Sequence, residues 1–199
     1  MSCMVIKPKK VTFLHIPKAG GTSIRFYLAN NYEIKSTTER DLHITAKQTR
    51  KHFGQDLGIQ FCVTRNPYDR WASLFYHTSR NEKFPWYADL KNHNHSQIRQ
   101  HFFAYLTTAL KTKFQNNLQW KIAKTCDYVL RFDQIEKDFS IIQDILGNNT
   151  IPFPKENTNP WVNDYSFLFK NKRIVELVNR ICDLEFKHLG YEQINNSSI

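Results

Sequence analysis

The stretch VTFLHIPKAGGTSIRFYL, from Val11 to Leu28, constrains the fold of this chain more than any other segment. Its apolar start, at 11–16, is typical of a buried strand, and 23–31 has the pattern of a helix that follows it. Pro17, Lys18 and two glycines lie between them, so the segment predicts a strand, a tight loop and a helix. Because such a loop brings backbone N–H groups to a helix N-terminus, we expect it to hold an anion.

Strands alternate with helices along the rest of the chain, which favours one α/β domain over residues 1–199, with three layers and a central, mostly parallel sheet. A polar tail, expected to fray, begins at about residue 192. Asp133 and Glu136 have the spacing of a capping box at the start of a helix. The further elements expected are strands at 32–35 and 59–64, a third core strand at 127–132, a surface loop at 80–95, and helices at 44–53, 68–79, 96–110, 133–147 and 173–188.

Composition narrows the class of protein. Hydrophobic residues make up 41% of the 199 positions, which suits a globular chain with a real core. The net charge of +10 favours anionic partners without choosing among polyanions, anionic surfaces and small anions. The four cysteines have no metal-binding or redox spacing, so we expect them to be reduced. The chain as given has neither a signal peptide nor a membrane-spanning run, so we expect a soluble, cytoplasmic protein.

A second loop, TRNPYDRWAS, follows the strand predicted at 59–64. It places Arg65 at the strand end and Ser73 two turns into the next helix, eight positions later (73 − 65 = 8). Ligands of parallel sheets bind at the carboxyl ends of the strands, so this pair predicts a second contact with phosphate. The alternative is that Arg65 pairs with Asp69 or caps the turn, and that Ser73 only packs.

The two loops together resemble one family. HIPKAGGTS is similar to the 5′-phosphosulfate loop of the sulfotransferases that use 3′-phosphoadenosine 5′-phosphosulfate (PAPS), and TRNPYDRWAS resembles their 3′-phosphate segment. The resemblance is strongest to the branch of Golgi carbohydrate sulfotransferases, such as the heparan and chondroitin enzymes. It extends to DYVLRFDQIEKDF and DLEFKHLGY, and it leaves the middle of the chain unmatched.

The resemblance implies a P-loop-like sulfotransferase fold that binds PAPS and its product PAP. It places the 3′-phosphate against Arg65 and Ser73, and the 5′-phosphosulfate against a loop whose members are Lys18, Ala19, Gly20, Gly21, Thr22 and Ser23. Lys18, Thr22 and Ser23 are then the candidate donors to the leaving oxygen. This chemistry requires no metal, so no metal cofactor is expected.

An acceptor hydroxyl also needs a general base, and histidine suits this task near neutral pH. His43 is the first choice, because a histidine in this region often serves as base in the resembling family, and its alternative role is a capping contact at the start of a helix. His15 is the second choice, with orientation of the turn as its alternative role. Glu39 and Asp41 come third. Asp133, where the family usually has glutamate, is interpreted as structural through the helix cap.

The expected acceptor is a small molecule or a glycan, with the aromatic residues of 81–95 and Trp161 as candidates for the rim of its cleft. Neither nucleic acid nor a membrane span is expected, and the oligomeric state is left open. Three alternatives also stay open. They are a small phosphate-loop nucleotide kinase, which the missing Gly-Lys-Ser/Thr disfavours, a non-catalytic basic module for nucleic acid, and a degenerate sulfotransferase that binds PAP without transfer.

Overall fold

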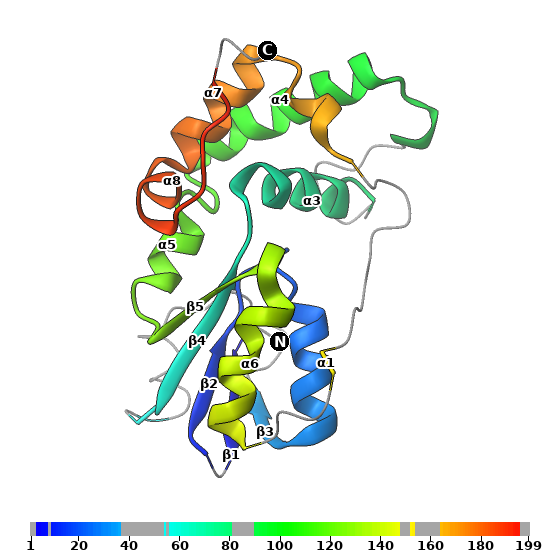
Figure 1. Ribbon diagram of the computed structural model, residues 1–199. Helices are drawn as coiled ribbons and strands as arrows, with labels where there is room; N and C mark the ends of the chain where they lie inside the picture. Colours follow the sequence, from blue (N-terminus) through cyan, green and yellow to red (C-terminus); the bar gives the residue numbers. More distant parts are fainter. Residues whose placement is uncertain are drawn as a thin grey trace. The chain divides into compact units, whose positions relative to one another are not determined.

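The computed structural model describes residues 3–7, 9–36, 54, 56–80, 90–147, 152–153 and 164–195 (Figure 1). The chain forms two compact units, each assembled from two separate stretches of sequence. The first unit comprises Met1–Arg65 and Gln119–Thr158, and the second comprises Asn66–Leu118 and Asn159–Ile199. The single sulfotransferase domain expected from the sequence stays a prediction. The helix expected at 44–53 and most of the loop expected at 80–95 lie outside the described residues.

A five-stranded mixed sheet forms the centre of the first unit. Its spatial order is β3-β1-β2-β4-β5, and its strands are β1 (Cys3–Lys7), β2 (Val11–Leu14), β3 (Glu33–Ser36), β4 (Ile59–Thr64) and β5 (Tyr128–Arg131). Strand β1 is antiparallel to both neighbours, whereas β2 pairs with β4 and β4 with β5 in parallel. The sequence did not predict β1, and the sheet expected to be mostly parallel has two parallel and two antiparallel pairings.

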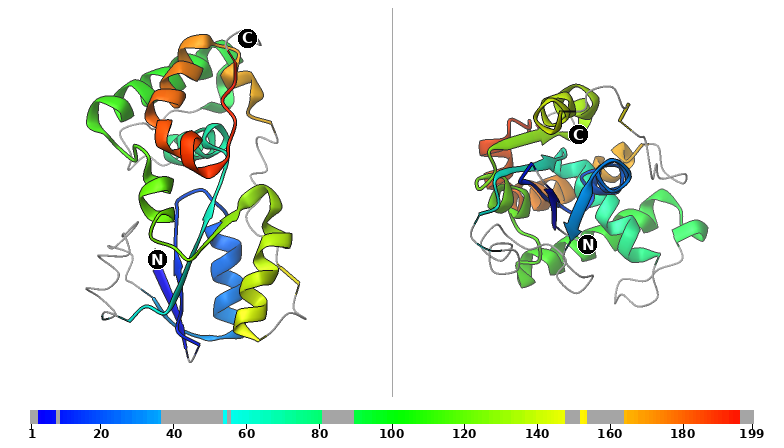
Figure 2. Two further views of the ribbon diagram at one scale, coloured as in Figure 1. Left: turned by 60° about the vertical axis from the view of Figure 1, so that its left-hand side comes forward. Right: turned by 90° about the horizontal axis from the view of Figure 1, so that it is seen from below.

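Helices flank this sheet, which confirms the α/β architecture. Helices α1 (Gly21–Asn31) and α6 (Ile135–Leu146) lie together on one face (Figures 1 and 2), where Tyr27 and Phe139 meet edge to face at 5.1 Å. The other face carries Cys62 of β4. A hydrogen bond with the Cys126 thiol, together with burial, raises the pKa of the Cys62 thiol well above its ordinary value. Cys126 follows the short helix α5 (Leu118–Ala123), so that segment lies against this second face.

Two local predictions about β5 and its surroundings are wrong. The strand expected at 127–132 is present at 128–131, but it lies at the edge of the sheet, where Leu130 is buried and Val129 is 40% exposed, so it is not the core strand that was expected. The 3₁₀ turn η2 (Phe132–Gln134) joins it to α6, and no side chain caps that helix. The Asp133 carboxylate instead pairs with the Arg131 guanidinium at 3.0 Å.

Helices build the second unit (Figure 2). Its elements are α3 (Pro67–Ser79), η1 (Leu90–Asn92), α4 (His95–Thr112), η3 (Ser166–Phe169), α7 (Lys172–Ile181) and α8 (Asp183–Leu189). The helix expected at 68–79 is confirmed as α3, and Trp71, Leu74, Phe75 and Thr78 on one of its faces are all buried. Within the part of the chain that the structure describes, no helix combines the length and apolar character needed to cross a bilayer.

The C-terminal part of the second unit departs from the sequence prediction at two points. The helix expected at 173–188 is two helices, which meet at Cys182, whose thiol accepts a hydrogen bond from Trp71 Nε1 at 3.0 Å. The tail does not fray at Tyr191, because Ile194 N donates to the Tyr68 hydroxyl at 2.9 Å. Two side chains of α3 therefore contact this part of the chain: Trp71 at the break between α7 and α8, and Tyr68 at the C-terminal tail.

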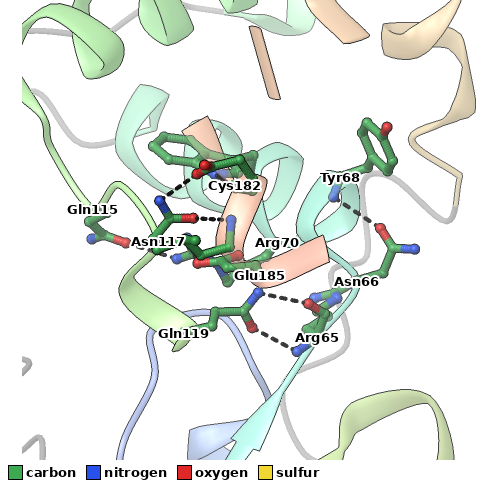
Figure 3. Close-up of polar contacts among 12 residues, drawn as sticks. Arg65, Asn66, Tyr68, Arg70, Gln115, Asn117, Gln119, Cys182 and Glu185 are labelled. Atoms are coloured by element: carbon green, nitrogen blue, oxygen red, sulfur yellow. Dashed lines mark hydrogen bonds and ion pairs between the residues drawn. The ribbon is translucent and has the colours of Figure 1, made fainter. Parts of the chain in front are cut away.

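A buried ion pair connects α3 with α8. Arg70 and Glu185 are both fully buried, and their charged groups lie 3.8 Å apart. Arg70 Nη1 also donates to Gln115 Oε1 at 2.9 Å, and Asn117 Oδ1 accepts from Leu184 N in the first turn of α8 (Figure 3). Because removing one member would leave the other charge buried, this pair ties the two helices to one arrangement.

Gly58 provides a test of how β4 is joined to β2. Its φ is +60°, and a Cβ at this position would lie 1.7 Å from the carbonyl oxygen of Lys10. We expect Gly58→Ala to lower the free energy of unfolding by roughly 3 kcal/mol or more, because backbone strain and a backbone clash add. Gly54, whose φ is also positive but whose Cβ would meet nothing within 4 Å, is the matched control. Urea denaturation should show a loss of about 1 kcal/mol for Gly54→Ala, and equal losses at the two positions would contradict the contact.

Candidate anion-binding site

Three parallel strands of the first unit end at the same edge of the sheet, and each is followed by residues that contribute to the candidate site. Strand β2 leads into the glycine loop, β4 leads to Arg65, and β5 leads to Phe132. The register pairs Phe13 with Phe61 and Phe61 with Tyr128. Since the carboxyl ends of parallel strands meet at one edge, the loop and Arg65 come together as the sequence predicted.

The glycine loop turns sharply into α1. Lys18 and Gly20 have φ values of +66° and +78°, and Gly20 is the N-cap of the helix without a side-chain cap. A residue other than glycine, such as Lys18, loses about 1–2 kcal/mol of conformational free energy in this left-handed backbone region. Such residues are concentrated at functional sites. An anion bound here would take the place of the missing cap and meet the positive end of the helix dipole.

His15 packs its ring against this loop. A Cβ on Gly21 would lie 2.2 Å from both Cδ2 and Nε2 of His15, so only glycine allows the ring to approach so closely. The same ring lies 6.0 Å from that of Phe13, centroid to centroid. These contacts support the architectural role that the sequence left open for His15 as the alternative to general base.

Arg65 is held by contacts with three other residues of the first unit. The buried Gln119 side chain pairs with its backbone twice: Oε1 accepts from Arg65 N at 2.8 Å, and Nε2 donates to Arg65 O at 2.9 Å (Figure 3). The guanidinium Nη1 donates to the Lys18 carbonyl oxygen at 3.3 Å. Its Cζ lies 4.7 Å from the centroid of the Phe132 ring. The arginine therefore reaches the glycine loop directly.

Sequence reasoning missed both Gln119 and Phe132. Gln119 lies on a short helix that was not predicted, and a helical glutamine gives no signal of pairing with a distant backbone. Phe132 was expected as the last residue of a strand, within a segment that had already been singled out. An aromatic residue directly after a parallel strand was the available signal, because such a position faces the carboxyl edge of the sheet.

The remaining candidate residues differ in placement. Thr22 is exposed, whereas Ala19 and Ser23 are buried beside the start of α1. Ser73 is a half-buried residue of α3, in the second unit, and its pairing with Arg65 stays a prediction. Three candidates for the general base lie outside the described residues, namely Glu39, Asp41 and His43.

No match is found in comparisons with the models of known families, with curated proteins or with solved structures. Among the described residues, no group of three or more His, Cys, Asp or Glu side chains could hold a metal ion. The features that point to a function are therefore the sequence motifs and the geometry of the loop and Arg65.

The double contact between Gln119 and the Arg65 backbone can be tested by stability. We expect Gln119→Leu to lower the free energy of unfolding by about 2 kcal/mol, because two partly buried backbone groups of Arg65 lose their partner. Lys121→Ala, an exposed change on the same helix, should stay within about 0.5 kcal/mol of wild type. Chemical denaturation measures the stability of both variants. If Gln119→Leu is as stable as Lys121→Ala, the contact between Gln119 and the Arg65 backbone does not contribute to stability.

Proposed function

We propose that this chain is a PAPS-dependent sulfotransferase that transfers a sulfuryl group to a hydroxyl acceptor, with a carbohydrate as the favoured acceptor class. The observation that carries the proposal is the contact between Arg65 Nη1 and the Lys18 carbonyl of the glycine loop. Two anion-binding elements at one edge of the sheet suit a nucleotide with phosphate groups at both its 5′ and 3′ positions. The 3′-phosphate is the group that distinguishes PAPS from ATP.

The residues of the first unit suit the charge changes of this reaction. The acceptor oxygen forms a bond to sulfur, the bond from sulfur to the bridging oxygen breaks, and the negative charge passes to the 5′-phosphate of PAP. Lys18 and the N–H groups at the start of α1 stabilise that charge, and the same contacts orient the sulfuryl group for in-line attack.

The hydroxyl proton goes to a general base. His43 remains the first proposal for this base, and His15 is the weaker one because its ring packs against Gly21. A His43→Ala enzyme that keeps its affinity for PAP while losing turnover would identify the base. Full activity in that variant would exclude His43.

Lys18→Ala should lower the rate of sulfuryl transfer by about a hundredfold or more, because the site loses its charged donor to the leaving oxygen. Lys18→Gly should lose the same activity and fold at least as stably, since glycine adopts a φ of +66° without strain. Transfer from labelled PAPS to a panel of glycans, phenols and small alcohols measures the rate. Lys10→Ala is the matched control, because Lys10 is an exposed lysine with a φ of +48° in the same unit. Near-normal turnover in both Lys18 variants would remove the lysine from the mechanism.

Arg65→Ala and Ser73→Ala should each weaken binding of PAP by about 10- to 100-fold, as expected for loss of a charge-assisted contact with phosphate. Binding of adenosine 5′-phosphosulfate, which lacks the 3′-phosphate, should change far less. Calorimetric titration of both ligands makes the comparison. An equal loss for the two ligands would show that these side chains support the fold, and a wild-type preference for ADP over PAP would favour the nucleotide kinase.

A further inference from the structure

One aromatic ring touches both anion-binding elements of the first unit. A Cβ on Gly20 would lie 2.7 Å from Cδ2 and Cε2 of Phe132, so the ring edge is in direct contact with the glycine loop. The Arg65 guanidinium carbon lies 4.7 Å from the centroid of the same ring. Phe132 is half buried and follows β5 in the turn η2.

This arrangement places the guanidinium over the face of the Phe132 ring. A guanidinium placed over an aromatic face is attracted to the ring, while its N–H donors lie in its own plane and point away from the ring. The Lys18 carbonyl takes one of these donors, on Nη1. The ring therefore orients Arg65 through the face of the guanidinium and not through its N–H donors.

The ring also defines how far apart the two elements lie. Phe132 is a rigid side chain with two rotatable bonds, and its backbone is fixed by the pairing of β5 with β4. Its edge meets Gly20, and its face meets Arg65. A smaller side chain would leave a gap at both contacts, and Arg65 would gain alternative rotamers.

We propose that Phe132 is a positioning residue that sets the separation between the glycine loop and Arg65, and so selects nucleotides phosphorylated at both the 5′ and the 3′ position. This inference rests on the proposed function, since it assigns the 5′ group to the loop and the 3′ group to Arg65. Phe132 acts through these two elements and not on the reacting atoms.

The test compares affinities for PAP and for 5′-AMP, which lacks the 3′-phosphate. In Phe132→Leu, the preference for PAP over 5′-AMP should fall by about 5- to 30-fold, which is the factor expected for a partly desolvated cation–π contact. Phe132→Tyr keeps the ring and should keep the preference within about twofold. Phe139→Leu is the structural control, because Phe139 is a fully buried ring that packs against Tyr27 and Phe61. It should lower stability and leave the preference unchanged.

A second readout needs no nucleotide. Phenylglyoxal reacts with accessible arginines, and mass spectrometry of the modified peptides follows Arg65, with the exposed Arg173 of α7 as internal reference. Modification of Arg65 should be faster in Phe132→Leu than in wild type or Phe132→Tyr, because the ring no longer covers one face of the guanidinium.

Each outcome decides a separate claim. The inference is overturned if Phe132→Leu keeps the wild-type preference for PAP, or if it weakens PAP and 5′-AMP equally. A wild-type protein that binds PAP no better than 5′-AMP would overturn the proposed function, and with it the selectivity assigned to Phe132. The phenylglyoxal reaction would then test the contact between Phe132 and Arg65 by itself. If Arg65 reacts equally fast in wild type and Phe132→Leu, this contact is overturned as well. If Arg65 reacts faster in Phe132→Leu, the contact stands, without the nucleotide selectivity.

Discussion

Parallel pairing of β2, β4 and β5 is the constraint on which the first unit depends. Backbone hydrogen bonds alone would allow the strands to slip, and a slip of one residue would exchange the two faces of a strand. Side-chain bonds oppose this. Thr12 Oγ1 donates to Leu57 O at 2.6 Å, Gln60 N donates to Asp127 Oδ2 at 2.7 Å, and Thr64 Oγ1 donates to Leu130 O at 3.2 Å. The glycine loop, Arg65 and Phe132 meet because each follows a strand whose register is held in this way.

Much of the fold could be predicted from local pattern. The strand at 59–64 was predicted with the bounds that it has, since its apolar, β-branched run is short and is bordered by turn residues. Strand β1 was missed because a run of five residues between Met1 and a lysine-rich turn has no distinctive period. The break at Cys182 has neither glycine nor proline to signal it, and the contact of the Cys182 thiol with Trp71 comes from another helix, far away in the sequence.

The part of the candidate site that could be predicted is the position of its loops at the ends of strands. Lys18, Gly20 and Arg65 follow from strands that end in loops, and parallel pairing brings such ends together. The supports of Arg65 could not be predicted, because Gln119 and Phe132 reach it from strands and helices that come much later in the chain. The cap assigned to Asp133 failed for a related reason, since the nearby Arg131 competes for the same carboxylate.

The interleaving of the two units has a consequence for synthesis on the ribosome. Strand β4 emerges at residues 59–64, but its partner β5 follows only after all of Asn66–Leu118, which belongs to the other unit. During that interval β4 presents an unpaired apolar edge, the kind of surface on which nascent chains aggregate. Arg65 also lacks both Gln119 and Phe132 until then. The edge that carries the glycine loop and Arg65 is therefore among the last parts of the first unit to form, and a nascent chain that stalls before β5 carries the loop without this arginine in place.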